Sequence, residues 1–297
     1  MQFKNQILLG DCRYILKNFD KNSISACITD PPYNYEFIGK DWDAQEVQRR
    51  LSNVKESKTL VKNIPYGSGL AGGVRNERWY ERNRENIINY EEWCLEGSRE
   101  LFRVVKPGAP VVVFNSSRTL AHVQVALEAS GFYARDIIVY RRSSGIPKGY
   151  NAEKQLKRKG FDKFNDWKGW HSCLRSEWEG IVVVQKPLSN NYTENIEKYG
   201  LGLFNTEYEA SGFQSNIIEN ISRDTREDFN VHCTVKPLEL MEKLISIFVP
   251  IGDDHIILDP FAGSGSTLVA AKNLGRNYIG IEMIEDYLKI IKRRLEE

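Results

Sequence analysis

The sequence predicts an α/β protein built on an open, mostly parallel β-sheet with helices on both faces. Short apolar, β-branched runs bounded by turn residues alternate along the chain with segments of helical periodicity. This alternation is typical of parallel sheets whose two faces are both covered. The length of 297 residues allows one large domain or a domain that carries a substantial insertion.

Seven apolar runs are expected to be buried strands: Ile7–Leu9, Ile24–Thr29, Val111–Phe114, Ile137–Tyr140, Ile181–Val184, Ile256–Leu258 and Tyr278–Ile281. Four segments between them are expected to be helices: Tyr90–Val105, Leu120–Ala129, Leu238–Val249 and Thr267–Leu274. Proline or glycine marks an end of each helix, because proline fits the first helical position and glycine ends a helix readily.

Two regions interrupt the alternation. Residues 36–89 are polar and arginine-rich and contain a glycine cluster at 67–73, which predicts a mobile surface loop. Residues 143–231 carry a basic run, three tryptophans and one predicted strand, and we expect a partly independent insertion there. The chain then divides into residues 1–142, 143–231 and 232–297.

The composition is that of an ordinary soluble protein, with 41% hydrophobic and 27% charged residues. The apolar run near the N-terminus is too short for a secretory signal, so a cytoplasmic location is expected. The five cysteines contain no C-x-x-C pair and predict neither a disulfide framework nor a zinc ribbon. His171 with Cys173 and His232 with Cys233 match no zinc spacing, so no metal is expected.

Positive charge is concentrated in one part of the chain although the net charge is only +1. Between Arg141 and Lys163 there are eight basic residues and two acidic ones. A basic run is most often a solvated face, but its place inside the insertion makes it a candidate for phosphate contacts. The candidate DNA-binding residues are Arg141, Arg142, Lys148, Lys154, Lys157, Arg158 and Lys159.

A glycine turn between a strand and a helix predicts a cofactor site near the C-terminus. The turn runs from Asp259 to Gly265 with the sequence D-P-F-A-G-S-G. It is not a P-loop because serine and threonine, rather than lysine, follow Gly265, and it lacks the third glycine of a dinucleotide site. Glu282 ends the next predicted strand, where a carboxylate can accept hydrogen bonds from two ribose hydroxyls. Together these features favour a nucleoside-type cofactor over a simple tight turn.

The tetrapeptide Asp30-Pro31-Pro32-Tyr33 predicts a site that holds an amino group. It follows a buried strand, so it should lie at the carboxyl edge of the sheet, where ligands of open α/β sheets bind. The two prolines stiffen the turn and offer carbonyls that can only accept. The Asp30 carboxylate and the Pro31 carbonyl would bind the exocyclic NH2 of a flipped adenine or cytosine, while Tyr33 stacks on the base. A proline-rich strand end with a packed tyrosine is the structural alternative.

With both motifs in view, the sequence resembles the amino-group (N6-adenine/N4-cytosine) DNA methyltransferases. The closest subgroup has D-P-P-Y before the target-recognition region and F-x-G-x-G last. Further matches are Gly10-Asp11, the stretch from Glu177 through Pro187, and Thr234-Val235-Lys236-Pro237. The resemblance implies a Rossmann-like, S-adenosylmethionine-dependent methyltransferase fold with permuted motif order. That order would make the C-terminal strands neighbours of the N-terminal ones and bring Gly263 close to Asp30.

The resemblance also assigns roles. Residues 1–142 would be the catalytic part, 143–231 the target-recognition region and 232–297 the cofactor-binding part. Asp11 would contact the adenine of S-adenosylmethionine, Glu282 its ribose and Lys236 its methionine end. The remaining cofactor-binding residues would be Asp259, Phe261, Ala262, Gly263, Ser264 and Gly265, and the catalytic residues Asp30, Pro31, Pro32 and Tyr33.

The resemblance favours adenine, because the cytosine enzymes more often carry serine in place of Asp30. The alternatives are an N4-cytosine enzyme, a DNA-binding homologue without activity, and an enzyme acting on structured RNA or on glutamine in a protein. Double-stranded DNA is the expected partner. The resemblance also suggests a cognate restriction endonuclease and a second copy of the chain, in a homodimer, as further partners. It implies no association with a membrane.

Overall fold

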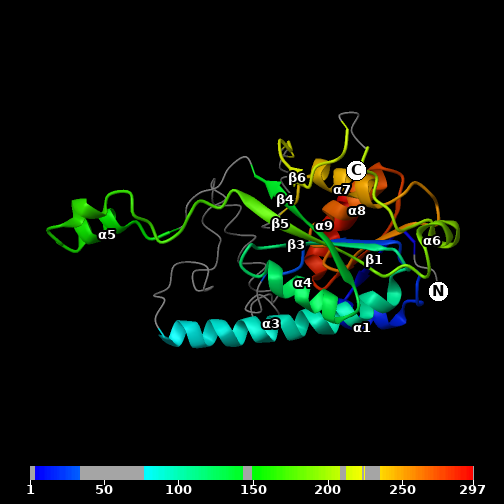
Figure 1. The fold of residues 1–297 in the computed structure, drawn as a ribbon, viewed down its shortest axis with the longest axis horizontal. Coiled ribbons are helices and arrows are strands. Elements are labelled where there is room, and N and C mark those ends of the chain that lie inside the picture. The colour runs from blue at the N-terminus through cyan, green and yellow to red at the C-terminus, as the bar shows by residue number, and fades with distance from the viewer. Residues whose placement is uncertain are drawn as a thin grey trace.

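A single eight-stranded sheet organises the computed structural model, which describes residues 4–33, 77–142, 149–207, 212–222, 224 and 235–296 (Figure 1). The strand order is β1-β8-β7-β2-β3-β5-β4-β6. The strands are β1 (Gln6–Leu9), β2 (Ala26–Thr29), β3 (Pro110–Asn115), β4 (Tyr133–Arg141), β5 (Trp178–Gln185), β6 (Ile217–Ile218), β7 (Ile256–Asp259) and β8 (Asn277–Glu282). Every predicted strand is present, and only the two-residue β6 was not predicted.

The sheet is mostly parallel, as the sequence predicts. From β1 through β8, β7 and β2 to β3, each neighbouring pair is parallel. Only β5 runs against its neighbours β3 and β4. The order also joins the two ends of the chain, because β1 pairs with β8 and β2 pairs with β7. Segments more than 200 residues apart in the sequence therefore end side by side at the carboxyl edge of the sheet.

The helices are α1 (Cys12–Ile15), α3 (Glu77–Val104), α4 (Leu120–Ala129), α5 (Ala152–Arg158), α6 (Tyr192–Tyr199), α7 (Leu238–Phe248), α8 (Ser266–Asn273) and α9 (Glu285–Glu296). The sequence predicts α4, α7 and α8 to within one residue at each end. It does not predict α1, α5, α6 or α9. Within the described ranges, no helix is both long enough and apolar enough to span a membrane.

The predicted loop over residues 36–89 is wrong for its last part, because 77–89 form the first turns of α3. Residues 36–76 of that prediction lie outside the described ranges. The sequence from Glu77 to Asn89 is rich in glutamate and arginine, which favour helix, but it has too few apolar residues to show a helical period. Only after Tyr90, which is fully buried, does α3 carry the apolar face that made it predictable.

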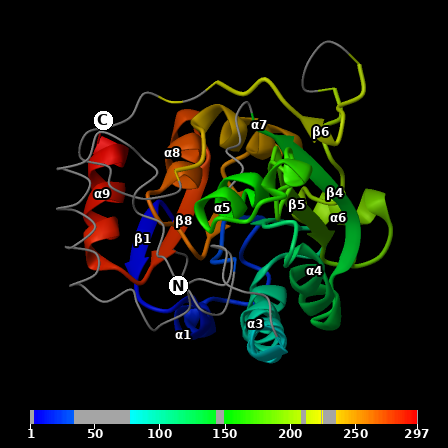
Figure 2. The same ribbon diagram turned by 90° about the vertical axis from the view of Figure 1, so that its left-hand side faces the viewer.

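The alternation of side chains along the strands builds two cores. One face of the sheet, with Cys27, Val111 and Val182, packs against α1, α3 and α4. The other face, with Ile28, Val112 and Val183, packs against α7 and α8. Figure 2 shows α1, α3 and α4 together on one side of the sheet and α7 and α8 on the other. Because successive residues of a strand point to opposite faces, a run such as Ile181–Val184 must be apolar throughout to fill both cores.

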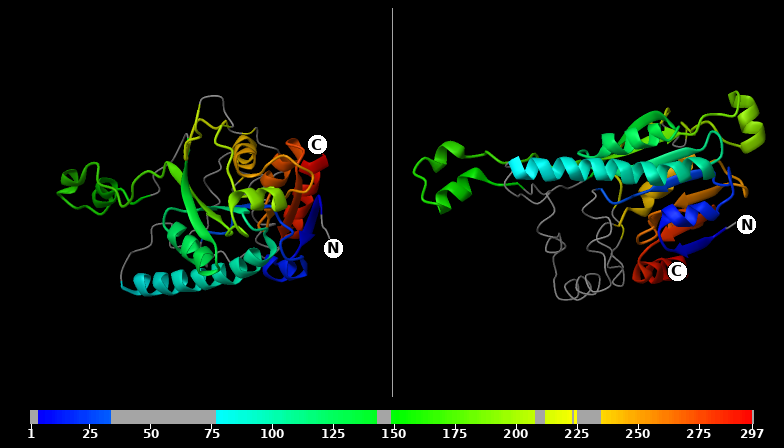
Figure 3. Two further views of the ribbon diagram at one scale, coloured as in Figure 1. Left: turned by 45° about the vertical axis from the view of Figure 1, so that its right-hand side comes forward. Right: turned by 90° about the horizontal axis from the view of Figure 1, so that it is seen from below.

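The predicted insertion over 143–231 is not separate from the sheet. Strand β5 lies inside the sheet between β3 and β4. Residues 149–177, by contrast, leave the body as an arm that carries α5 (Figures 1 and 3). The arm is closed at its base, where Ala152 N donates to the Trp170 carbonyl at 3.0 Å and Ser172 N donates to the Tyr150 carbonyl at 3.0 Å. The sheet is therefore shared, and only the arm stands apart from it.

A buried lysine after β5 ties this strand to α3. Lys186 is 8% exposed, and its Nζ donates to the carbonyls of Phe102 and Val105 at 2.7 and 2.8 Å and to Asn22 Oδ1 at 2.9 Å. The last carbonyls of a helix have no partner within the helix. Lys186 supplies donors to this end of α3 and so fixes the helix against the sheet.

We predict that Lys186→Met lowers the free energy of unfolding by about 2 kcal/mol or more, because it leaves buried carbonyls without a donor. Urea unfolding followed by circular dichroism measures this. The control is Lys289→Met, which removes an exposed ion pair with Asp286 on α9 and should leave the unfolding midpoint unchanged. Equal midpoints for the two variants would contradict the role of Lys186.

Candidate functional site

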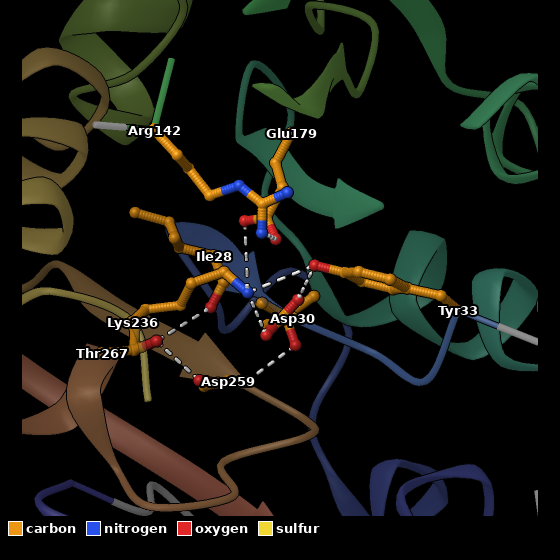
Figure 4. A network of polar contacts seen from close by, with 9 residues as sticks. Ile28, Asp30, Tyr33, Arg142, Glu179, Lys236, Asp259 and Thr267 are labelled. Carbon is orange, nitrogen blue, oxygen red and sulfur yellow. Dashed lines mark hydrogen bonds and ion pairs between the residues drawn. The ribbon is translucent and has the colours of Figure 1, made fainter. Parts of the chain in front are cut away.

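The predicted catalytic tetrapeptide lies at the carboxyl end of β2, and its aspartate is held by two side chains. Tyr33 Oη donates to Asp30 Oδ1 at 2.6 Å, and Lys236 Nζ donates to Asp30 Oδ2. Lys236 Nζ also lies 3.2 Å from Tyr33 Oη. Figure 4 shows the lysine and the tyrosine converging on the Asp30 carboxylate. Lys236, which the resemblance places at the methionine end of the cofactor, is thus in contact with the predicted catalytic motif.

The backbone of the tetrapeptide is fixed by helix α3 and the segment after β3. Tyr90 Oη donates to the Pro32 carbonyl at 2.8 Å, and Thr119 Oγ1 donates to the Tyr33 carbonyl at 3.0 Å. Asn115 Nδ2 in turn donates to Tyr90 Oη at 2.8 Å. In the described part of the chain, no donor reaches the carbonyl of Pro31. That carbonyl keeps its acceptor capacity, as the sequence-based assignment to an amino group requires.

Asp30 belongs to a group of four charged side chains that alternate in sign. Lys236 Nζ lies 3.7 Å from Glu179 Oε2, and Glu179 Oε1 accepts from Arg142 Nη1 at 3.2 Å. The Lys236 side chain is only 10% exposed. Burial acts to lower the pKa of Lys236, but the carboxylates of Asp30 and Glu179 outweigh burial and raise it above its ordinary value. Lys236 is therefore a charged ammonium between two carboxylates.

The glycine turn is joined to the catalytic motif through a buried carboxylate. Asp259 ends β7 and accepts hydrogen bonds from Thr29 Oγ1 at 2.7 Å, from Thr267 Oγ1 at 2.6 Å and from Phe261 N at 3.1 Å. Burial raises the pKa of Asp259 to about 6 even though these bonds act to lower it. Thr29 directly precedes Asp30, so Asp259 fixes the two predicted motifs relative to each other.

Glu282 closes the turn from the end of β8. Its carboxylate accepts from Gly263 N and Ile284 N, each at 2.8 Å. Burial raises the pKa of Glu282 to about 7. Gly265 has a φ of +81°, and a Cβ on it would lie 2.9 Å from Cγ2 of Ile291 on α9, so no other residue fits there without strain.

Ala262 and Ser264 of the turn are buried, and the backbone there is also held by hydrogen bonds. Ala262 N donates to the Ile281 carbonyl at 2.9 Å, and Arg294 Nη1 donates to the Ser264 carbonyl at 2.8 Å. Arg294 is a buried residue of α9 that the sequence did not single out. The turn therefore has a defined backbone shape set by both β8 and α9.

Asp11 lies beside Glu282, because Gly10 N donates to the Glu282 carbonyl at 2.9 Å. The Asp11 side chain caps α1 by accepting from Arg13 N at 2.9 Å and pairs with Arg13 Nη2 at 2.6 Å. Burial acts to raise the pKa of Asp11, but the bonds to Arg13 outweigh it, so the carboxyl stays ionised. Two carboxylates thus flank the carboxyl ends of β1 and β8.

A mainly apolar pocket is lined by residues of α1, α3 and the two motifs. Its lining includes Cys12, Pro31, Trp93 and Phe261. The Phe261 and Trp93 ring centroids are 5.4 Å apart. The pocket therefore connects the catalytic motif, through Pro31, with the glycine turn, through Phe261.

The predicted DNA-binding residues occupy different places. Arg142 belongs to the charged group around Asp30, and Arg141 pairs with Glu219 at 3.3 Å on the surface. On the arm, the basic residues of α5 and its end are all exposed: Lys154, Lys157, Arg158 and Lys159. Lys148 lies outside the described residues. The basic run is thus split between the site and the arm.

Sequence reasoning gave no role to Glu179, Thr29 or Thr267. Glu179 lies within a stretch that matches the family, and the two threonines stand at the predicted end of a strand and the predicted start of a helix. A polar residue at an otherwise apolar strand end, as at Thr29, was the available signal. The partners of these side chains are set by the sheet order and have no signature in local sequence.

An open α/β sheet with an acidic D-P-P-Y turn after one strand and a glycine turn after its neighbour defines a Rossmann-like methyltransferase fold. Comparison with known proteins agrees. A family model described as DNA methylase, for N6/N4 methyltransferases, matches residues 24–293. The chain belongs to this DNA methylase family.

Relatives and solved structures cover nearly the whole chain. The Type II methyltransferase M.HindIII of Haemophilus influenzae is 33% identical over 303 residues, which span 96% of this chain and 93% of the relative. M.HinfI, also of Haemophilus influenzae, is 25% identical over 99% of this chain and 69% of its own. The M1.HpyAVI–SAM complex has a TM-score of 0.54 at 23% identity, with 98% of each chain covered. The cytosine-N4-specific PvuII DNA methyltransferase has a TM-score of 0.59 at 15% identity over 100% of this chain and 94% of that one.

The raised pKa of Glu282 predicts a pH effect on stability. Between the ordinary value of 4.5 and about 7, the folded protein holds a proton that the unfolded chain has lost. The free energy of unfolding therefore rises as pH falls through this window, by about 1–3 kcal/mol from this group. Glu282→Gln should remove that contribution, which urea unfolding at pH 5 and pH 8 measures.

The matched control is Glu285→Gln, an exposed glutamate at the start of α9. This variant should keep the pH dependence of the wild type. If Glu282→Gln keeps it too, the Glu282 carboxyl is not the proton-binding group.

Proposed function

We propose that the protein is a site-specific DNA methyltransferase that moves a methyl group from S-adenosylmethionine to the N6 amino group of a flipped adenine. The observation that carries the proposal is the hydrogen bond from Thr29 to Asp259. It fixes an amino-binding carboxylate, Asp30, next to a glycine turn of the kind that holds a nucleoside cofactor.

The residues around the glycine turn fit S-adenosylmethionine. Glu282 is an acid at the end of β8 that can accept from ribose hydroxyls, and Asp11 beside it can accept from the adenine amino group. Phe261 and Trp93 provide apolar surface nearby. The ammonium of Lys236 contacts Asp30. We therefore assign Lys236 to the part of the site that binds the target base, instead of to the methionine end of S-adenosylmethionine. Bound S-adenosylmethionine supplies an activated methyl group on a sulfonium sulfur.

The chain's own residues prepare the amino nitrogen. That nitrogen is a poor nucleophile, because its lone pair is delocalised into the ring. The Asp30 carboxylate and the Pro31 carbonyl accept its two N–H groups, which favours a tetrahedral nitrogen with a free lone pair. If the nitrogen took the methyl group and S-adenosylhomocysteine left, positive charge would grow on the nitrogen. The Asp30 carboxylate would stabilise that charge until one N–H proton passes to solvent. Tyr33 lies against the base that has left the duplex.

Mapping of modified bases tests the proposal directly. We expect expression in a methylation-free host to yield N6-methyladenine at one short sequence, read by sequencing of the host DNA. N4-methylcytosine instead would contradict the choice of base, and no modified base would favour a DNA-binding homologue without activity. Expression of Asp30→Ala gives the matched background.

In vitro, Asp30→Ala should lower the turnover of methyl transfer by about a thousandfold or more, because Asp30 acts mainly on the transition state. The dissociation constant for S-adenosylmethionine should change by no more than about threefold, since Asp30 is not among the cofactor residues. Single-turnover transfer and equilibrium dialysis measure the two quantities. Turnover close to that of the wild type would reject the mechanism.

We propose that the arm over residues 149–177 contacts duplex DNA. Its basic side chains are exposed, and Lys157 Nζ lies 5.4 Å from the centre of the Phe164 ring, so cationic and aromatic groups share one surface. The exposed Trp167 and Trp170 pack edge to face, with centroids 6.0 Å apart. Cationic groups on a projecting element can reach phosphates and position the protein on the duplex.

Neutralising Lys157, Arg158 and Lys159 to glutamine should weaken DNA binding and lower the slope of log K against log salt by about 2–3, near one per lost phosphate contact. Fluorescence anisotropy over a salt series measures both. The control carries the same charge change on α9, at Lys289, Lys292 and Arg293, far from the arm (Figure 3). An unchanged slope in the arm variant would make its basic run a merely solvated face.

We also propose that the enzyme protects a site cut by a cognate restriction endonuclease and works in the cytoplasm. The supporting observation is the 33% identity with M.HindIII, which is named a Type II methyltransferase. A homodimer is a further proposal from the family resemblance alone. Sedimentation of the purified protein tests it.

A further inference from the structure

The ammonium of Lys236 lies among three acceptors in the catalytic site. It contacts Asp30 Oδ2, lies 3.2 Å from Tyr33 Oη and lies 3.7 Å from Glu179 Oε2. In Figure 4 the ammonium points between the two carboxylates. It therefore already contacts one acid and needs only a small movement to contact the other.

Lys236 offers Asp30 the same kind of N–H donor that a target amino group would bring. With Tyr33 on Oδ1 and Lys236 on Oδ2, both oxygens of the Asp30 carboxylate are engaged. The ammonium also neutralises the carboxylate's charge, which is the charge needed to stabilise a nitrogen that becomes positive. For Asp30 to serve the target base fully, Lys236 has to move away from it.

Glu179 gives Lys236 a second position inside the protein. A buried ammonium cannot leave its partner without a large desolvation cost unless another acid receives it. The Glu179 side chain is only 16% exposed and is held in place by Arg142 at 3.2 Å. It stands at the start of β5, on a different element from Asp30, so a base bound to Asp30 need not disturb it.

We propose that Lys236 is a placeholder: without DNA, its ammonium occupies the position on Asp30 that the target amino group would take. Glu179 is a positioning residue that pairs with Lys236 when the target base binds to Asp30. The inference rests on the proposed role of Asp30 as the acceptor of that amino group. A structural ion pair predicts something different, because losing it would affect all DNA ligands equally.

The test compares two duplexes that contain the mapped recognition sequence. One has the natural target base, and in the other the exocyclic amino group of that base is replaced by hydrogen. Dissociation constants are measured with S-adenosylhomocysteine present, so that no transfer occurs. We call the dissociation constant for the amino-free duplex divided by that for the natural duplex the amino preference. The ratio for Asp30→Ala gives the baseline that remains without the Asp30 carboxylate, set by the DNA and the Pro31 carbonyl, since the cost of flipping each base is common to all variants.

We expect the wild type to exceed this baseline by about tenfold or more, as for a hydrogen bond to a charged group. Glu179→Gln should bring the preference close to the baseline while binding of the amino-free duplex stays within about twofold. In a Lys236→Met background, Glu179→Gln should have no effect on the preference, because no placeholder remains to be received. Glu285→Gln, at an exposed glutamate of α9 outside both the site and the arm, is the control and should keep the wild-type preference.

Three results would overturn the inference. If Glu179→Gln keeps the amino preference, or weakens both duplexes equally, Glu179 does not receive Lys236. If its effect persists in the Lys236→Met background, it acts through another group. A wild type at the Asp30→Ala baseline would instead reject the proposed role of Asp30 and, with it, this inference.

Discussion

The site depends on one buried carboxylate, Asp259, which two threonines from opposite ends of the chain bind at once. Thr29 belongs to β2 and Thr267 to α8, and both hydroxyls reach the same side chain at 2.7 and 2.6 Å. A buried carboxylate requires such donors, because burial without them is costly. Meeting that requirement fixes the end of β2, and therefore Asp30, against the glycine turn after β7.

The charges of the site are balanced in the same way. Arg142, Glu179, Lys236 and Asp30 alternate in sign, and each comes from a different element of the fold. Such a group tolerates burial only as a set, since removing one member leaves its neighbour unpaired. The same alternation lets one member change partner while the total charge is conserved, which is the physical basis of the exchange that we propose for Lys236.

The candidate site lies in the body of the protein, and the proposed DNA contacts lie on the arm. The sheet holds both motifs at its carboxyl edge, where hydrogen bonds from α3, β8 and α9 fix their backbones. The arm over 149–177 projects away from this edge (Figure 1). It carries exposed basic and aromatic side chains. The arm ends next to β5, where Arg142 N donates to the Glu177 carbonyl at 2.7 Å. The proposed DNA contacts and the charged group around Asp30 are therefore neighbours along the chain.

The sequence by itself determined the α/β class, seven of the eight strands and the two motifs, because apolar runs, prolines and glycines act locally. Local pattern gave no signal for the polar start of α3, where no apolar period exists. Helix α9 was not predicted either, although its buried residues Tyr287, Leu288 and Ile291 recur at helical spacing. Only the tertiary structure decided that β5 enters the sheet antiparallel, that Asp259 joins Thr29 to Thr267, and that Lys236 contacts Asp30 beside Glu179. The reason is physical: those partners are brought together by sheet order and burial, and a side chain's sequence neighbours do not record which distant charge will lie against it.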